Sequence, residues 1–309
     1  MEEKSVQTES LKKSVNVFAI FCIAGLAVNI LLKYLLKIFG VYENYTLSNL
    51  SDIAVSIISM LGISLICAKF CGGMKFCISK YQKKTGHLDN FLLVVLGFSG
   101  CVTISHIVGF ISDIIYTIFP YQVDDSGAAL SVNTDIYSVF LMMLSVAVVP
   151  AICEEFSFRG FAMGSLSDFG QGLAVLFSSI LFGMMHNGFL GILFALLAGL
   201  LFACIRKTSG SLIPAMIVHI LNNAYSHSIL LFVSAFGIDL YATVSTVFTY
   251  CMIALFIVML IVVHKRKTGF FTFESNNCVL TKSEKTKTVF STPLLWIFVV
   301  FVIVANFLR

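Results

Sequence analysis

The chain has 309 residues, of which 58% are hydrophobic and only 12% charged, and its formal net charge is +4. Soluble globular domains carry about 25% charged residues, so this composition excludes a large soluble domain. The basic residues form no dense patch interleaved with aromatic side chains, and we expect no nucleic-acid partner. The nine cysteines include no CxxC pair and lie mostly in apolar stretches, a pattern typical of reduced packing residues.

Nine apolar stretches follow one another along the chain. Each is long enough, or nearly so, to cross a bilayer as a helix, which takes roughly 18 residues. They are residues 15–38, 50–70, 88–119, 136–166, 172–187, 189–205, 212–236, 242–263 and 294–308. Residues 1–13 are polar, and the first stretch is too long for a cleavable signal peptide, so we expect it to stay in the membrane.

These stretches predict an all-α, polytopic transmembrane bundle with about eight or nine transmembrane helices. Residues 88–119 and 136–166 are long for one crossing but too short for two crossings and a turn. We expect each to form one helix that is tilted or extends past the membrane surface.

Positive charge gathers in alternate connections. Five lysines lie between residue 69, near the end of the second stretch, and the start of the third, Arg206 and Lys207 follow the sixth, and residues 265–292 carry six basic residues. The connection at about 120–135 has acidic residues and no Lys or Arg. With nine spans, every basic connection falls on one side. The positive-inside rule then predicts a multi-pass cell-membrane protein with a cytoplasmic N-terminus, a cytoplasmic loop at 265–292 and the C-terminus outside.

Ionisable side chains inside apolar helices are costly, so each one marks a candidate functional site. In the fourth stretch, Glu154, Glu155 and Arg159 follow Pro150. Glu155 and Arg159 share a helix face, whereas Glu154 is rotated by about 100°. We expect Arg159 to neutralise Glu155 and to leave Glu154 free for proton chemistry; alternatively, both acids belong to one ion-pair network. Pro150 donates no backbone hydrogen bond, so the helix can kink there.

Two further clusters place a histidine one helical turn from another conspicuous side chain. Phe182 and His186 share a face in the fifth stretch, and His219 and Asn223 share a face in the seventh, where Asn222 is adjacent. Taken alone, His186 also fits an interfacial role. The other pair likewise fits hydrogen bonding between helices.

The three clusters can meet at one depth if the fourth helix is long. At 1.5 Å per residue, Glu154 lies roughly 18 Å from a helix end at residue 166. His186 lies about 21 Å from residue 172, and His219 about 11 Å from residue 212. If the fourth helix ended near Glu154, that carboxylate would lie at the opposite surface from His186.

The order and spacing of the clusters resemble a known family. Glu-Glu-x-x-Phe-Arg-Gly begins at Glu154, Phe-x-x-x-His ends at His186, and His-x-x-x-Asn begins at His219, within Gly-Ser-Leu-x-Pro-x-x-x-x-His-x-x-x-Asn. On separate apolar helices and in this order, they resemble the CAAX-protease and bacteriocin-processing family of intramembrane endopeptidases. The resemblance covers about residues 145–225.

The resemblance implies a catalytic role at four positions. Glu154 is expected to be the general base that activates water, helped by His186. His219 and Asn223 are expected to face the scissile carbonyl and stabilise the oxyanion. The residues themselves are consistent with these roles, because a desolvated carboxylate can serve as a base and donors at a developing oxyanion lower the barrier.

The remaining motif residues are expected to support the site, and Glu155 and Arg159 would do so by ordering the helix. The supporting residues are Glu155, Arg159, Phe182 and Asn222. Whether the site uses a metal stays open. Glu154, His186 and His219 suit a three-ligand zinc site, but the resemblance equally allows a metal-free mechanism with glutamate and water, which we favour.

The composition, with four prolines and no long Gly/Ser tract, predicts one polytopic membrane domain, and the motifs locate its catalytic core. We expect a single membrane domain over 1–309, with N-terminal helices at 14–120, a catalytic core at 136–236 and C-terminal helices at 242–309. Outside the motifs, His106 and Asp113 share a face and could line the cavity. Asn29 and Lys33 are expected to pack and to reach the membrane interface.

The expected partners are the lipid bilayer and a peptide or membrane-protein substrate. A non-catalytic membrane scaffold or bacteriocin-immunity protein of the same fold is the main alternative, although an intact motif set favours catalysis. A proton-coupled transporter fits less well, because the sequence shows neither internal repeats nor paired broken helices. Signatures of other intramembrane proteases, such as His-Glu-x-x-His or Gly-x-Ser-x-Gly, do not occur.

Overall fold

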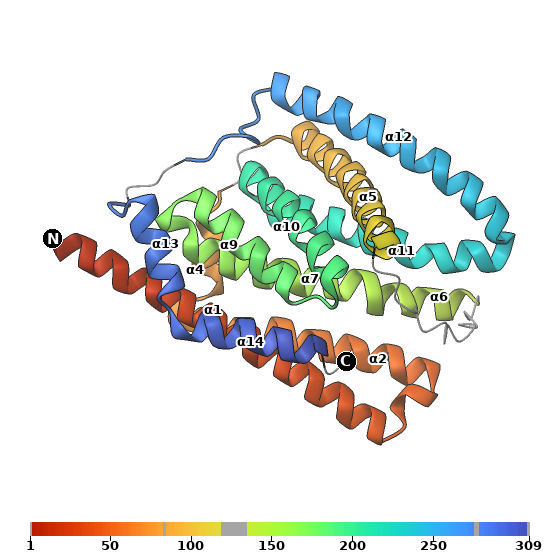
Figure 1. Cartoon of the computed structure of the whole chain (residues 1–309), viewed down its shortest axis with the longest axis horizontal. Helices are drawn as coiled ribbons and strands as arrows, with labels where there is room; N and C mark the ends of the chain where they lie inside the picture. Colours follow the sequence, from red (N-terminus) through yellow and green to blue (C-terminus); the bar gives the residue numbers. More distant parts are fainter. Residues whose placement is uncertain (1, 83–84, 119–134, 275–277, 308–309) are drawn as a thin grey trace.

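The computed structural model describes residues 2–82, 85–118, 135–274 and 278–307, and these residues form helices with no strand, which confirms the all-α prediction. The α-helices are α1 (Glu2–Ile38), α2 (Tyr45–Ser56), α3 (Ile63–Ala68), α4 (Met74–Ser79), α5 (His87–Ile118), α6 (Ile136–Met143), α7 (Val149–Glu155), α8 (Met163–Leu166), α9 (Gln171–Met184), α10 (Phe189–Ser209), α11 (Leu212–Phe236), α12 (Ile238–Lys265), α13 (Lys282–Phe290) and α14 (Pro293–Phe307). Figure 1 shows them as a bundle of long helices.

Among the described residues, seven helical stretches are long and apolar enough to cross a membrane, or up to eight if the bent pair α13 and α14 forms one span. The chain is therefore a polytopic membrane protein, as predicted. The count differs from nine mainly at the predicted span 172–187. There α9 has 14 residues and a length of about 21 Å, which is short of the hydrocarbon thickness.

The fourth apolar stretch forms one long helix from Ile136 to Phe169, as the common depth of the motifs requires. It contains α6, α7 and α8, which are joined by π-helical segments at Leu144–Val148 and Phe156–Ala162. The first segment directly precedes the turn with Pro150, where a backbone donor is missing. Widened turns of this kind often occur at functional sites, and here they flank the helix segment that ends at Glu155.

Polar connections gather at one end of the bundle, on the left of Figure 1. Lys80 forms an ion pair of 2.8 Å with Asp168, and Arg266 forms one of 2.6 Å with Asp89. Lys207 donates to three backbone carbonyls of the connection that follows α12. The basic connections therefore share one end, as predicted from their sequence positions. That this end faces the cytoplasm stays a prediction.

The fourth helix packs against α1 on one side. The Phe21 ring meets the Phe158 ring at 5.6 Å and the Phe18 ring meets the Phe161 ring at 5.0 Å, both edge to face. Later residues of α1 contact earlier residues of the fourth helix, so the two run antiparallel. The helix that carries Glu154 is thereby fixed against an N-terminal wall.

On the other side, α5, α10 and α11 pack closely around Gly97 of α5. A Cβ atom at Gly97 would lie 2.6 Å from Val218 of α11 and 2.7 Å from Ile205 of α10. A side chain at Gly97 would therefore have to displace the side chains of Val218 and Ile205. The contact sets the position of α11, the helix that carries His219.

The predicted polar loop 265–292 contains a helix. Thr281 and Glu284 form a capping box at the start of α13, which is bent by 60° relative to α14. Of the acidic connection expected at 120–135, only Asp135 is described, and its side chain caps α6. The end of the last predicted span at residue 308 and the C-terminal Arg309 lie outside the described residues.

Candidate active site

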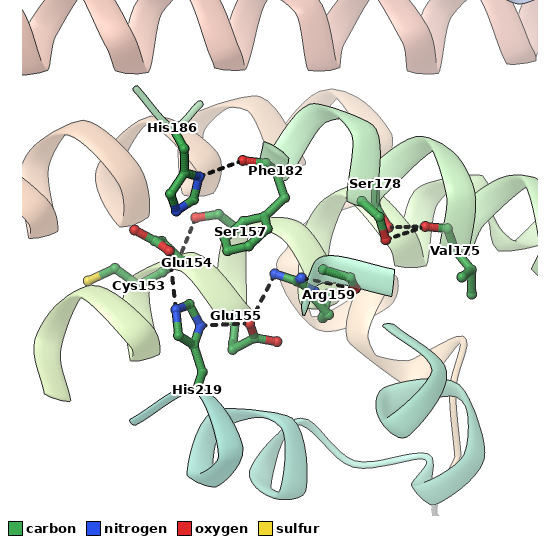
Figure 2. A network of polar contacts seen from close by, with 12 residues as sticks. Cys153, Glu154, Glu155, Ser157, Arg159, Val175, Ser178, Phe182, His186 and His219 are labelled. Atoms are coloured by element: carbon green, nitrogen blue, oxygen red, sulfur yellow. Dashed lines mark hydrogen bonds and ion pairs between the residues drawn. The ribbon is translucent and has the colours of Figure 1, made fainter. Parts of the chain in front are cut away.

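The two adjacent carboxylates at the end of α7 have different surroundings, as Figure 2 shows. Glu155 is completely buried, and its Oε1 atom lies 2.9 Å from Nη1 of Arg159, which confirms the ion pair predicted from their spacing. The Glu154 side chain is 18% exposed and lines a cavity. One carboxylate is therefore neutralised inside the bundle, whereas its neighbour can be reached by a small molecule.

Arg159 is held by more than its carboxylate partner. Its Nη2 atom donates a hydrogen bond of 3.2 Å to the backbone carbonyl of Gly199 on α10, and its guanidinium lies 4.2 Å from the Phe182 ring centroid. A Cβ atom at Gly199 would lie 3.0 Å from the Phe182 ring and 3.3 Å from Nη2. The absence of a side chain on α10 therefore lets this buried cation keep its carbonyl and aromatic partners.

His219 on α11 lies between the two carboxylates. Its Nδ1 atom is 3.0 Å from Glu155 Oε1, and its Nε2 atom is 3.6 Å from Glu154 Oε2. A carboxylate accepts hydrogen bonds, so we assign the Nδ1 proton from this contact. The longer contact exceeds normal hydrogen-bond length, which leaves Glu154 and Nε2 free to engage a third group.

His186 follows the end of α9 and is oriented by that helix. Its Nδ1 atom lies 2.9 Å from the backbone carbonyl oxygen of Phe182, so Nδ1 donates and Nε2 carries the lone pair. In Figure 2 the Glu154 carboxylate lies between the rings of His186 and His219. The Phe182 ring contacts both imidazoles edge to face, at 4.8 Å and 5.7 Å. Phe182 therefore spaces the two histidines, a structural reason for its place in the motif.

The cavity in front of Glu154 and His186 has a volume of about 500 Å³. Its opposite wall comes from α1 and from the π-helical segment that follows α2, and it includes Asn29, Lys33 and Met60. Asn29 and Lys33 were expected to pack and to reach the membrane interface. Both in fact line the cavity. Their four-residue spacing on α1 was a visible signal, but it did not show what that face would meet.

Asn222 and Asn223 lie one turn beyond His219. Asn222 is buried and donates a 3.3 Å hydrogen bond to Oδ1 of Asn223, which is half-buried. Neither residue lines the cavity of Glu154. The structure thus brings together Glu154, His186 and His219, with Asn223 on the neighbouring turn of α11.

His106 and Asp113 do not reach this cavity. They line a separate hollow of about 340 Å³ between α5, α11 and α12, where Tyr225 and Tyr241 also contribute. The expectation that they line the cavity of the motif residues is therefore wrong. His106 and Asp113 do share a face of α5, as predicted, but that face is turned toward α12.

A zinc site formed by Glu154, His186 and His219 was one hypothesis from the sequence. Within the described parts of the chain, no group of three or more His, Cys, Asp or Glu side chains is arranged to hold a metal ion. Glu154, His186 and His219 therefore do not form a ready three-ligand site in this conformation.

Comparison with known families identifies the segment that carries the site. Residues 136–225 match the family model described as type II CAAX prenyl endopeptidase Rce1-like, and this range contains every motif residue. Searches of curated proteins and of solved structures each found no match. The family match confirms the resemblance read from the motifs: residues 136–225 are similar to the type II CAAX prenyl endopeptidase Rce1-like family.

Proposed function

We propose that this chain is an intramembrane endopeptidase that hydrolyses a peptide bond with water activated by Glu154 and His186. One observation carries the proposal: an accessible carboxylate faces an internal cavity between two imidazoles, while the adjacent carboxylate is neutralised by Arg159. A buried ionisable cluster is costly in an apolar bundle, and catalysis is a reason to keep it.

The first step is proton removal from water. A water molecule in the cavity can donate one hydrogen to the Glu154 carboxylate and the other to Nε2 of His186, whose Nδ1 proton is held by the Phe182 carbonyl. As Glu154 takes the proton, the water oxygen attacks the scissile carbonyl. Glu154 then passes that proton to the leaving amine, so the base is restored when the peptide bond breaks.

Stabilisation of the oxyanion is assigned to α11. With His219 protonated, Arg159, Glu155, His219 and Glu154 form a row of alternating charges that sums to zero, so the imidazolium is balanced inside the bundle. Its Nε2 proton is then available to the carbonyl oxygen as negative charge develops. The side-chain amide of Asn223 on the neighbouring turn is proposed as the second donor.

The test is a comparison of membrane proteomes. Cells carrying the wild-type chain, Glu154→Gln or His186→Ala are analysed for new peptide termini in membrane and secreted fractions. The matched control is Asp113→Asn, which removes a carboxylate from the separate hollow. We expect defined termini to appear with the wild type and the control and to be lost in both site variants.

The same experiment separates the enzyme from a scaffold or immunity protein. If Glu154→Gln preserves both the peptide termini and the cellular phenotype, the chain does not act as a protease. A peptide or a membrane-protein segment is the proposed substrate, in keeping with the CAAX-type protease family.

We propose that the basic end of the bundle faces the cytoplasm. α1 begins at this end, where Lys4 pairs with Glu284 at 3.0 Å, so the N-terminus would be cytoplasmic. The C-terminus is proposed to lie outside. Reporter fusions to each terminus, active only on one side of the membrane, test the two assignments separately.

A further inference from the structure

One basic side chain lines the cavity of Glu154, and it comes from outside the family segment. Among the described residues that line the cavity, Lys33 on α1 is the single Lys or Arg. Its side chain is 52% exposed, and most of the other lining residues are buried or half-buried. Lys33 therefore lies at the opening of the cavity, whereas Glu154 lies at its inner wall.

Helix geometry gives the offset, along the helix axes, between the two backbone positions that carry these charges. The contact between Phe21 and Phe158 places those residues at one level of the antiparallel helices. Glu154 is one turn, about 6 Å, from that level, and Lys33 is about 18 Å from it in the same direction. The two backbones are thus offset by about 12 Å along the helix axes. An extended peptide covers this distance with three or four residues at roughly 3.3 Å each.

The present partner of Lys33 holds it weakly. Its Nζ atom is 3.7 Å from Oδ1 of Asp52, which is longer than a hydrogen bond, and both side chains are partly exposed. Exposed ion pairs contribute little to stability. Another carboxylate could therefore replace Asp52 with little loss. Asn29, one turn deeper on α1, is held by a 3.4 Å hydrogen bond to Ser59 and continues the polar wall toward Glu154.

We propose that Lys33, supported by Asn29, forms a subsite for a carboxylate of the substrate, three or four residues from the scissile bond. The inference rests on the proposed peptidase function and adds a selection rule to it. Glu154 repels an anionic group from the inner wall, and Lys33 attracts it at the opening. The two charges together orient the peptide. The carboxylate can be a free C-terminus or an acidic side chain.

The test uses a short dansyl-labelled peptide of alanine and leucine in three forms. One has a free C-terminal carboxylate, one a C-terminal amide, and one an amide together with an internal aspartate. Binding is measured on the full chain in lipid nanodiscs in a Glu154→Gln background, so that no cleavage is needed. Wild-type protein is assayed in parallel for cleavage of the same peptides.

We expect Lys33→Met to weaken binding of the carboxylate forms by roughly fivefold to tenfold and to leave the amide unchanged. Lys33→Arg should keep the preference. Asp52→Asn should strengthen carboxylate binding, because it removes the competing anion. Lys37→Met is the matched control, since Lys37 is exposed on the same helix but does not line the cavity.

The direction of each change in binding affinity tests the proposed subsite. Equal changes for carboxylate and amide peptides, or weaker binding after both Lys33→Met and Asp52→Asn, would mean that the pair only ties two helices together. A response confined to the free C-terminus or to the aspartate form assigns the carboxylate to that source. If the wild type binds with the predicted preference but cleaves no peptide, the subsite stands and the proposed peptidase function fails. If the protein cleaves the peptides equally well with and without the Lys33→Met substitution, whatever their C-terminus, the proposed peptidase function stands and the subsite fails.

Discussion

Replacing either member of the Glu155–Arg159 pair alone should destabilise the protein at least as much as replacing both members together. Both side chains are completely buried, and the ion pair measures 2.9 Å. Glu155→Gln leaves a buried guanidinium without its counter-charge, and Arg159→Met leaves a buried carboxylate. Removing one partner of such a pair costs about 3–5 kcal/mol, so we expect each single variant to lose about 3 kcal/mol of unfolding free energy.

The double variant removes both charges and with them the uncompensated charge. Oε2 of Glu155 has no hydrogen-bond partner among the described residues, so the glutamine amide group replaces it without breaking a bond. The loss that remains is the hydrogen bond of Arg159 to Gly199 and its contact with the Phe182 ring. These contacts are worth about 2 kcal/mol together. The double variant should therefore lose about 2–3 kcal/mol, against about 6 for independent effects.

The measurement is a reversible SDS titration in mixed micelles, followed by circular dichroism, for the four proteins of the cycle. A coupling free energy of about 3 kcal/mol between the two positions supports the buried pair. If the double variant equals the sum of the single variants within about 0.5 kcal/mol, the two side chains do not act as a pair and the argument fails.

Three further outcomes are expected. Gly199→Ala should destabilise the protein by about 1–3 kcal/mol in the same titration, because its methyl group would press on Phe182 and Arg159. Gly191→Ala is the control and should leave the stability unchanged, because the space around Gly191 is open. Equal effects of the two substitutions would contradict the packing argument. Asn306→Ala should lower the turnover of the proposed hydrolysis by about fivefold, because Asn306 accepts a 2.7 Å hydrogen bond from the backbone amide of Gly188, two residues after His186. Unchanged turnover would show that this hydrogen bond is dispensable. Purified protein stripped with a chelator should keep full activity, and activity that returns only with added zinc would refute the metal-free mechanism.

Local spacing predicted one ion pair and the length of one helix correctly. The Glu155–Arg159 pair follows from four-residue spacing on a helix, and the length of the fourth helix follows from an apolar run without a break. Both are properties of a single continuous segment. Helical periodicity alone therefore reveals them before any packing between helices is known.

The short α9 shows where composition was insufficient. The predicted span 172–187 extends three residues beyond Met184, where α9 ends, and the chain then turns at Gly188, whose φ of 67° favours glycine. The turn is fixed by Asn306, a residue 118 positions away. Average hydropathy reports how apolar a stretch is, and it does not report where a helix ends or which distant residue holds the turn that follows.

The cavity wall was missed for a related reason. Asn29 and Lys33 face the cavity because α1 packs on the fourth helix through Phe18 and Phe21. The sequence shows which residues share a face of α1, but not what that face meets. His106 and Asp113 illustrate the same limit, since their common face meets α12 instead of the motif helices.

The surfaces that enclose the cavity come from two separate stretches of the chain. Glu154 and His186 belong to the family segment, whereas the facing wall with Lys33 is encoded upstream of it. Mutations in the upstream stretch can change which molecules fit the cavity without altering Glu154 or His186. Related chains could thus differ in substrate specificity while they retain the same proposed chemistry. A comparison limited to the shared segment would not detect the difference.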